Sequence, residues 1–566
     1  MDVFVKKPWI FLVLLLFLQF PLLSPLLQEG YYHSHDDFSV QRVLEYKASL
    51  QNGDFPARWS DNLLYGHGYP LFIFYSPLVY AAGAIISIAG LSALTSVKLL
   101  SGLFIIGGAL GIFLWLRALT NNTIGAFVGA LLYSYAPYRA TDLYIRGALA
   151  EFAGLSLLPW ILLLHWKMVK ERSRVACIGT GLLTGALVST HHITGLLYGM
   201  FYLPYLFYAY MRIRPPVKPF LLCVFISVLI ALGVSGWYWI PLLIESRYIH
   251  TSTLYAFPLN FFLLTIGGLW HSPWGYGGVL EQDPLSLQLG KTMFIIVGGT
   301  IAGIPVWIAK KNFSLLYWGM IFCVFAFLEL RPSAFIWDSI PLLHVLRIPW
   351  RIHLLLITIG AYISALVSVE LLSLARTANR NDAPLMGYFL CLSLMMATQI
   401  SFFNPKMFYR ESFPHETTTW DDEYLPIWVK QKPTGSPSGV RVLSGNATVM
   451  KQELSYLNKQ VEVSVREEAT LGIPTLWYPG WSVRLNTQYI TPGVHPEFGT
   501  ITVTVPPGEH TLLLRFTKTW WRQFADILSV STLAVVIIVI SVSAPVQDKK
   551  FPLQRRRKHG KPTPFS

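Results

Sequence analysis

Long apolar runs separated by short polar segments cover most of the chain. The first run, residues 9–27, is long enough for one membrane span, which needs about 20 residues. Eleven further runs predict spans at 96–116, 123–137, 152–168, 175–190, 194–211, 219–240, 291–309, 313–330, 352–374, 384–401 and 525–545. The pattern therefore predicts a polytopic α-helical membrane protein with about twelve transmembrane helices. A signal peptide is the competing interpretation of the first run, but no small-residue cleavage site precedes Gln28.

Residues 71–91 form one more apolar stretch, and its assignment decides the topology. Counting it as a span would place the basic cluster 167–174 outside the cell and reverse the charge bias of the loops. Cytoplasmic loops of membrane proteins are enriched in Lys and Arg. We therefore interpret 71–91 as a juxtamembrane or re-entrant segment, broken near Pro77 and Gly83. Both termini are then predicted to be cytoplasmic.

The polar block 402–522 has the pattern of a small β-domain. Residues 460–465 and 500–505 alternate apolar and polar positions, as half-buried strands do. Residues 506–509 have the composition of a turn, and 511–516 are predicted to be the strand after it. We expect an antiparallel, sandwich-like domain outside the cytoplasm. The predicted organisation is a transmembrane domain 1–401 with a first outside loop 28–95, the β-domain 402–522, a last helix 523–546 and a basic tail 547–566.

Composition supports this assignment and excludes other classes. The chain is 53% hydrophobic with a mean hydropathy of +0.47, and only 13% of its residues are charged, against about a quarter in soluble proteins. The net charge of +14 comes largely from the predicted cytoplasmic turns and tail, so it does not indicate nucleic-acid binding. The four cysteines lie in apolar stretches and form neither a disulfide framework nor a metal motif.

Asp36 and Asp37 are the first candidate for chemistry, in the loop after the first span. Adjacent carboxylates outside a membrane can supply a general base or bind a cation. The alternative is that Asp37 caps a helix that continues through Leu50. His33, His35 and His67 lie in the same loop, and two of them with one aspartate are compatible with a metal site, although the spacing is not diagnostic.

Arg146 and Glu151 form a second group of candidate functional residues. They lie at the predicted ends of apolar helices, where burying ionisable side chains is costly. Two interpretations remain open: an arginine aimed at a phosphate, or an ion pair that fixes a helix end. Further basic and aromatic residues on the same predicted side complete the candidate substrate-binding set: Arg58, Tyr69, His191, His192, His271, Arg347 and Arg351. Arg146, Arg347 and Arg351 could together hold a phosphate or diphosphate.

Several of these motifs occur in an order that resembles a known family. They are adjacent acidic residues in the first loop, Gly-x-Phe-Pro-x-Arg-Trp at 53–59, Gly-x-Gly-Tyr-Pro-Leu-Phe at 66–72, Arg-Gly-Ala-x-Ala-Glu-Phe at 146–152, His191-His192 and Pro-Trp-Arg at 349–351. The set resembles the bacterial membrane proteins labelled "6-pyruvoyl-tetrahydropterin synthase-related", which are similar to YfhO-like proteins. The wider resemblance is to type C glycosyltransferases. Nothing in the chain resembles a soluble zinc-dependent pterin synthase.

The resemblance implies an enzyme of the bacterial inner membrane that takes a sugar from a polyprenyl-phosphate donor. In that class a first-loop carboxylate is the base or a metal ligand, a role that would fall on Asp36 or Asp37. A second acidic ligand would correspond to Asp142 or Glu151, and a divalent metal such as Mg²⁺ or Mn²⁺ is compatible but not required. The expected partners are a lipid-linked sugar donor and a glycan or lipid acceptor.

Two other function classes remain as alternatives. A transporter or flippase of a lipid substrate would show inverted repeats and ionisable residues at the membrane midplane, whereas here the ionisable residues gather at one face. A non-catalytic scaffold would use the β-domain to dock a partner. We expect the glycosyltransferase.

Overall fold

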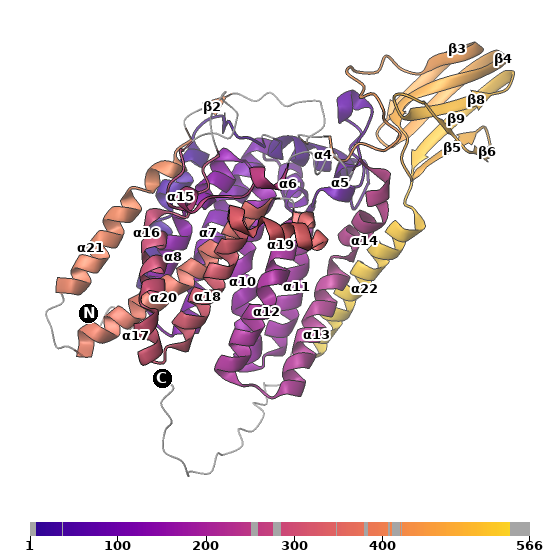
Figure 1. Ribbon diagram of the computed structural model, residues 1–566. Coiled ribbons are helices and arrows are strands. Elements are labelled where there is room, and N and C mark those ends of the chain that lie inside the picture. The colour runs from indigo at the N-terminus through magenta and orange to yellow at the C-terminus, as the bar shows by residue number, and fades with distance from the viewer. Residues whose placement is uncertain are drawn as a thin grey trace.

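A computed structural model describes residues 7–36, 38–250, 258–274, 285–346, 348–377, 383–405, 408–409, 419 and 422–543. A bundle of long helices forms most of it, and a β-domain lies beyond one end of the bundle (Figure 1). The bundle helices are α2 (Pro8–Phe17), α3 (Phe20–Leu23), α7 (Ala93–Thr120), α8 (Thr123–Ser134), α10 (Leu149–Glu171), α11 (Arg174–Thr190), α12 (His192–Ile213), α13 (Val217–Val234), α14 (Gly236–Glu245), α16 (Lys291–Ala302), α17 (Ile304–Ala309), α18 (Phe313–Glu329), α20 (His353–Thr377), α21 (Ala383–Ala397) and α22 (Trp520–Ser543).

Each span predicted from the apolar pattern coincides with one of these helices or with a pair that continues in one direction. Among the residues that the structure describes, six helical stretches are long and apolar enough to cross a membrane: 8–27, 93–120, 149–171, 217–234, 349–374 and 520–542. We call the bundle end that carries residues 28–91 and the β-domain the loop end.

The turns at the opposite end are short because polar residues stop and restart the helices there. Asn121 ends α7 with a left-handed backbone (φ 52°), and the side chain of the next residue, Asn122, accepts a hydrogen bond from the amide of Gly125 to begin α8. The α10–α11 turn has the same arrangement: Arg172 ends α10 with φ 53°, and the side chain of Ser173 caps α11. Such caps satisfy amide groups that a helix terminus leaves without partners.

Residues 71–91 do not span the bundle, as predicted. They form α5 (Leu71–Phe74) and α6 (Leu78–Ile88), separated at Pro77, and α6 packs on α4 (Ser39–Gln51) and α7 at the loop end. The predicted break at Gly83 is wrong, because α6 continues through it. Gly83 instead permits close packing: a Cβ there would lie 2.7 Å from Cγ2 of Val43.

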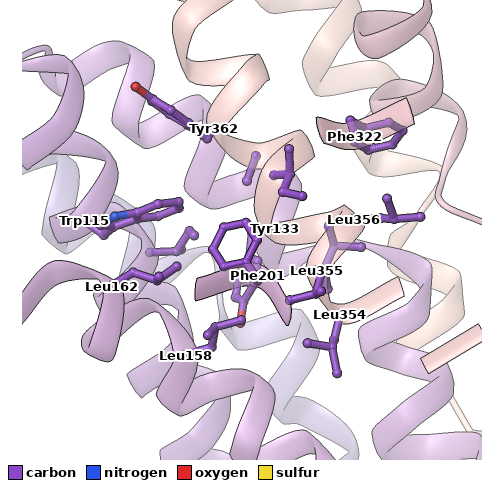
Figure 2. Packing of buried hydrophobic residues seen from close by; sticks show 14 of the residues in the cluster. Trp115, Tyr133, Leu158, Leu162, Phe201, Phe322, Leu354, Leu355, Leu356 and Tyr362 are labelled. Atoms are coloured by element: carbon purple, nitrogen blue, oxygen red, sulfur yellow. The ribbon is translucent and has the colours of Figure 1, made fainter. Parts of the chain in front are cut away.

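The bundle core is built from large side chains of α7, α8, α10, α12, α18 and α20 (Figure 2). Trp115, Leu158, Phe201 and Tyr362 are each at most 1% exposed. Two polar groups within this apolar core are paired. The indole of Trp115 donates to the hydroxyl of Tyr205 at 2.9 Å, and the hydroxyl of Tyr205 donates to the carbonyl of Leu162 at 3.0 Å. Buried polar groups without such partners would be costly.

The β-domain is a single antiparallel sheet, not the predicted sandwich. Its strands are β3 (Arg441–Ser455), β4 (Asn458–Leu476), β5 (Trp481–Leu485), β6 (Gln488–Ile490), β7 (Gly493–Val494), β8 (Thr500–Val505) and β9 (Gly508–Phe516). The first half of β4 pairs with β9 and the second half pairs with β8. On its other edge, β4 pairs with the whole length of β3. The long strand β4 thus pairs directly with β3, β8 and β9, and the remaining strands join the same sheet through β8 and β9. The predicted strands 460–465, 500–505 and 511–516 are confirmed.

The chain between the bundle and this sheet belongs to the loop end. β2 (Phe408–Tyr409) pairs with β1 (Tyr31–Tyr32) of the first loop, and the amide of Ile427 donates to the carbonyl of Tyr248 at 3.0 Å. The sheet itself begins at Arg441, later than the predicted domain boundary at 402.

Helix α22 returns from the β-domain along α13 and α14 (Figure 1). At its start Arg522 donates from Nε and Nη2 to the carboxylate of Glu245, at 2.7 and 2.8 Å, with both side chains fully buried. Lower down, the hydroxyl of Ser529 donates to the carbonyl of Gly233 at 2.8 Å. The last helix is therefore an integral part of the bundle.

Gly233 allows this close approach, and replacing it should loosen α22. A Cβ at Gly233 would lie 2.4 Å from Oγ1 of Thr532, so Gly233→Val should lower the free energy of unfolding by about 1–3 kcal/mol, as overpacking does. Thermal unfolding in detergent would measure the change. Gly199→Val in α12 is the matched control, because a Cβ there meets nothing within 4 Å. Equal effects of the two substitutions would contradict the packing described.

Candidate functional site

The first loop and the loop before α10 meet through their backbones. The amide of His35 donates to the carbonyl of Ile145 at 2.7 Å, and the amide of Asp36 donates to the carbonyl of Arg146 at 2.6 Å. Gly147 makes the contact possible, since its φ is +67° and a Cβ there would lie 2.3 Å from Oγ of Ser34. The two groups of candidate residues predicted around Asp36 and around Arg146 are therefore adjacent in space.

Asp36 is held as a carboxylate. Burial alone would raise its pKa, but the hydrogen bond from His35 and the charges of Arg146, His35 and Arg42 outweigh that effect and lower the pKa to about 2. Nδ1 of His35 lies 3.2 Å from Oδ1 of Asp36, and the Asp36 side chain remains 22% exposed. Asp36 is therefore an accessible anion at physiological pH.

Arg42, on α4, supplies part of the positive charge around Asp36. Its guanidinium lies 3.8 Å from the centre of the Tyr75 ring and donates to the hydroxyl of Tyr80 at 3.2 Å. The sequence pattern did not single out this residue, because its partners Tyr75 and Tyr80 stand in a later part of the chain.

Arg146 lies in a buried group of charges next to Asp36. A short π-helical segment, residues 141–145, precedes it and carries Asp142; such segments are frequent at functional sites. Nη1 of Arg146 lies 2.7 Å from Oδ1 of Asp142 and 2.9 Å from Oε2 of Glu151. The Arg146–Glu151 ion pair, one of the two interpretations left open above, is thus present.

Arg351 completes this group from the 3₁₀ turn η9 (Pro349–Ile352), directly before α20. Its Nε donates to Oε2 of Glu151 at 3.2 Å, and its side chain is 16% exposed, against 6% for Arg146. Tyr138, which no sequence pattern indicated as a site residue, donates its hydroxyl to Oε1 of Glu151 at 2.6 Å. Glu151 therefore binds two guanidinium groups, of which Arg351 is the more accessible. We call Asp142, Arg146, Glu151 and Arg351 the charged cluster.

The histidine pair at the start of α12 lies at the same end. His191 caps the helix, with Nδ1 2.7 Å from Oγ1 of Thr194. Nδ1 of His192 lies 3.0 Å from Oγ of Ser76 and 2.9 Å from the hydroxyl of Tyr238. Both imidazoles thus have structural partners, and His191 is 8% exposed.

Arg58 and Tyr69, two predicted substrate-binding residues, lie in the contact between the first loop and later parts of the chain. Nη2 of Arg58 lies 2.7 Å from Oδ1 of Asp526 on α22, and Arg58 is 1% exposed. The hydroxyl of Tyr69 accepts a hydrogen bond from the amide of Tyr424 at 3.1 Å, and Tyr69 is fully buried. Because both are enclosed by the fold, we leave them out of the proposed site.

The remaining predicted residues are dispersed. Asp37 and Arg347 lie outside the described residues. His67 contacts the β-domain, where its carbonyl accepts from the amide of Leu476 at 2.8 Å, so the three first-loop histidines do not surround Asp36. His271 is exposed and lines a separate cleft.

A metal site does not form from the residues that the structure describes. Within those ranges no group of three or more His, Cys, Asp or Glu side chains could hold an ion. Asp36 is hydrogen-bonded to His35, and Asp142 is paired with Arg146. Asp37, the third predicted ligand, lies outside the described residues, so the divalent metal stays a prediction, and we derive no step through one.

Glu45 on α4 makes the stability of the loop end depend on pH. Burial, with the nearby charge of Asp61, outweighs the hydrogen bonds from Asn62 and Gln41 and raises the Glu45 pKa to about 7. The pKa in the folded protein exceeds the ordinary value of 4.5, so this contribution to stability is complete below about pH 4.5 and is lost as the pH rises through 7. Asp61 is itself paired with Lys459, at 2.9 Å.

Glu45→Gln should therefore stabilise the protein at pH 8 and change little at pH 5. At about 1.4 kcal/mol for each pKa unit, we expect a gain of about 2–3 kcal/mol in the free energy of unfolding at pH 8. Unfolding curves at the two pH values would measure it. Glu468→Gln, at an exposed position of β4, should have no such effect, and a gain of equal size at both pH values would refute the assignment.

Comparisons with known proteins place the chain in a family. Residues 72–397 match the 6-pyruvoyl-tetrahydropterin synthase related domain, described as a membrane protein. No curated protein matches the chain in sequence.

Solved structures with a similar arrangement share little sequence with the chain. The arabinofuranosyltransferase AftD from Mycobacteria is 13% identical with a TM-score of 0.43, covering 70% of this chain and 27% of that one. The Archaeoglobus fulgidus oligosaccharyltransferase in the apo form is 13% identical with a TM-score of 0.45, covering 71% and 56%. The chain thus spans about a quarter of the first protein and just over half of the second. On the match over more than half of its length, the chain belongs to the 6-pyruvoyl-tetrahydropterin synthase related family of membrane proteins.

Proposed function

We propose that the chain is a membrane glycosyltransferase that moves a sugar from a polyprenyl-phosphate donor to an acceptor hydroxyl at the loop end. One observation carries the proposal: the hydrogen bond between the Asp36 amide and the Arg146 carbonyl, at 2.6 Å. It brings an accessible carboxylate beside a group of arginines at the ends of apolar helices, which supports the proposal that a lipid-linked phosphate binds there.

Each charged group has a role in this reaction. Arg351, the more exposed guanidinium, binds the donor phosphate, since a guanidinium suits phosphate oxygens. Glu151 orients Arg351 from one side and pairs with Arg146 on the other. Arg146 raises the local positive potential without having to contact the donor.

The transfer step is an inverting displacement. The acceptor oxygen attacks the anomeric carbon, the bond from that carbon to the phosphate oxygen breaks, and the polyprenyl phosphate leaves with the bonding pair. The acceptor proton passes to the Asp36 carboxylate. With a pKa near 2, Asp36 is a weak base for a free hydroxyl. It can still accept the proton as attack proceeds, because the oxygen then becomes positively charged and strongly acidic.

The loop end is proposed to face away from the cytoplasm. Basic residues occupy the turns at the opposite end, among them Arg172, Arg214 and Lys311, in the distribution that cytoplasmic loops show. The β-domain would then lie beside the acceptor, outside the inner membrane.

Substitution of Arg351 tests the phosphate contact. Arg351→Gln should lower kcat/KM for the donor about 10–100-fold, the effect of losing one charged hydrogen bond, mainly through KM. The protein should remain folded, because Glu151 keeps Arg146 as a partner. Arg331→Gln, at an exposed position of the same end, is the control. An unchanged KM in Arg351→Gln would remove Arg351 from the site.

A further inference from the structure

A second cleft opens at the loop end, above the start of α16 and the end of α21. Its volume is about 540 Å³ including the open mouth, and its lining residues are His271, Ser272, Trp274, Gln288, Lys291, Thr398, Gln399 and Phe402. The cleft is open on one side, so it would hold a single sugar ring against its lining and leave the rest of a larger glycan in solvent. Nothing in the proposed transfer step uses this lining.

Buried amides form the polar part of the cleft. Gln288 and Gln399 are only 3% and 4% exposed. Nε2 of Gln288 donates to the carbonyl of Ser272 at 3.2 Å and to Oγ of Ser286 at 3.1 Å, which fixes the amide plane. Because both N–H groups of Gln288 are used in these bonds, its Oε1 is the atom that would accept a hydrogen bond from a ligand hydroxyl.

An aromatic pair and a cation complete the lining. The rings of Trp274 and Phe402 stack with their centres 4.5 Å apart and their planes at 29°, and both side chains are half-buried. Lys291, the first residue of α16, is exposed. No Asp or Glu is among the eight lining residues, so the cleft favours a ligand that combines apolar ring faces, hydroxyl groups and a negative charge.

The cleft connects to the charged cluster through one chain segment. Oγ of Ser272 lies 3.0 Å from Oγ of Ser286, and the hydroxyl of Thr141 donates to the carbonyl of Ser286 at 2.8 Å. Thr141 directly precedes Asp142 of the cluster. The 285–290 segment therefore contacts both the cleft lining and the residue that precedes the charged cluster.

We infer that this cleft is a saccharide-binding subsite that selects sugars carrying an anionic group, a phosphate or a carboxylate. In the proposed reaction it holds a unit of the acceptor glycan, and to that extent the inference rests on the proposed function. Trp274 contacts a ring face, Gln288 and Gln399 recognise hydroxyl groups, and Lys291 binds the anionic group.

Binding of simple sugars to the full-length protein in phosphatidylcholine nanodiscs tests the inference. Saturation-transfer NMR would compare methyl glucuronide with methyl glucoside, and glucose 6-phosphate with inorganic phosphate. We expect each anionic sugar to bind about tenfold more tightly than methyl glucoside, the effect of one charged hydrogen bond. Lys291→Gln should abolish this preference for anionic sugars, and Trp274→Ala should lower the affinity for every sugar. Lys430→Gln, at an exposed position away from the cleft, should change neither the preference nor the affinity.

Several outcomes would overturn the inference. Equal affinity for glucuronide and glucoside would remove the anionic selection. Inorganic phosphate binding as tightly as glucose 6-phosphate would show a simple anion site. Displacement of the sugars by polyprenyl phosphate in the nanodisc would assign the cleft to a lipid headgroup. An unchanged affinity in folded Lys291→Gln and Trp274→Ala proteins would place any sugar elsewhere.

The same samples separate this inference from the proposed function. Asp36→Asn should bind the sugars as the wild-type protein does, because Asp36 does not line the cleft. If the wild-type protein binds the sugars but transfers none, the subsite is supported and the transferase is refuted. If it transfers sugar but binds none in the cleft, the transferase is supported and the subsite is refuted.

Discussion

Asp36→Asn should reduce sugar transfer by about 10²–10⁴-fold, the range that a general base contributes. Asparagine keeps the size of the side chain and one acceptor oxygen but cannot take the acceptor proton. The backbone hydrogen bond from residue 36 to the Arg146 carbonyl does not involve the side chain, so the loop should keep its place. Initial rates with a polyprenyl-phosphate sugar would measure the loss, largely in kcat.

Asp54→Asn is the matched control for this substitution. Asp54 lies in the same loop, but its carboxylate accepts from the amide of Arg58 at 3.3 Å and not from a group near the cluster. It should retain most of the transfer activity. If Asp36→Asn is as active as Asp54→Asn, the base is another residue, and Asp37→Asn is then the decisive variant.

Glu245→Ala should have the largest effect on stability, a loss of about 3–5 kcal/mol in the free energy of unfolding. Its carboxylate accepts from Nε and Nη2 of Arg522 and, at 2.7 Å, from the indole of Trp521. Removing the carboxylate leaves a fully buried guanidinium without its charge partner, which costs far more than the pair gains. Because these bonds join α14 to the start of α22, cleavage between the β-domain and α22 in limited proteolysis should accelerate.

Glu453→Ala provides the comparison for Glu245→Ala. Glu453 pairs with Lys451 at 2.9 Å, but both side chains are more than half exposed, and such surface pairs contribute little. Similar proteolysis and unfolding in the two variants would contradict a structural role for the Glu245–Arg522 pair.

The apolar pattern was sufficient to predict the helices because a membrane-spanning helix is defined by its length and composition. The charge bias correctly assigned residues 71–91, where hydropathy alone was ambiguous. Strand 500–505 was predicted residue for residue, since its period of two is set by one buried face. The sandwich was wrong because alternation within a strand does not reveal which strands share one long partner, as β8 and β9 share β4.

The candidate site depended on contacts that sequence spacing does not encode. Asp36 and Arg146 were each predicted, yet their connection runs through backbone atoms and the special conformation of Gly147. Arg58 looked like a binding residue because it stands in a motif with Trp59, but its partner Asp526 is 468 residues away. Tyr138 and Arg42 were missed because nothing in their local sequence indicates the charges that they contact.

Transfer from a lipid donor is the most direct test of the proposed function. The purified protein would be offered a panel of radiolabelled polyprenyl-phosphate sugars, with and without EDTA, and the release of polyprenyl phosphate and the labelled product would be followed. The proposal predicts turnover with at least one donor, inversion at the anomeric carbon, and loss of both products in Asp36→Asn. Folded protein that binds the lipid donors but turns over none of them would contradict the transferase and favour a lipid transporter.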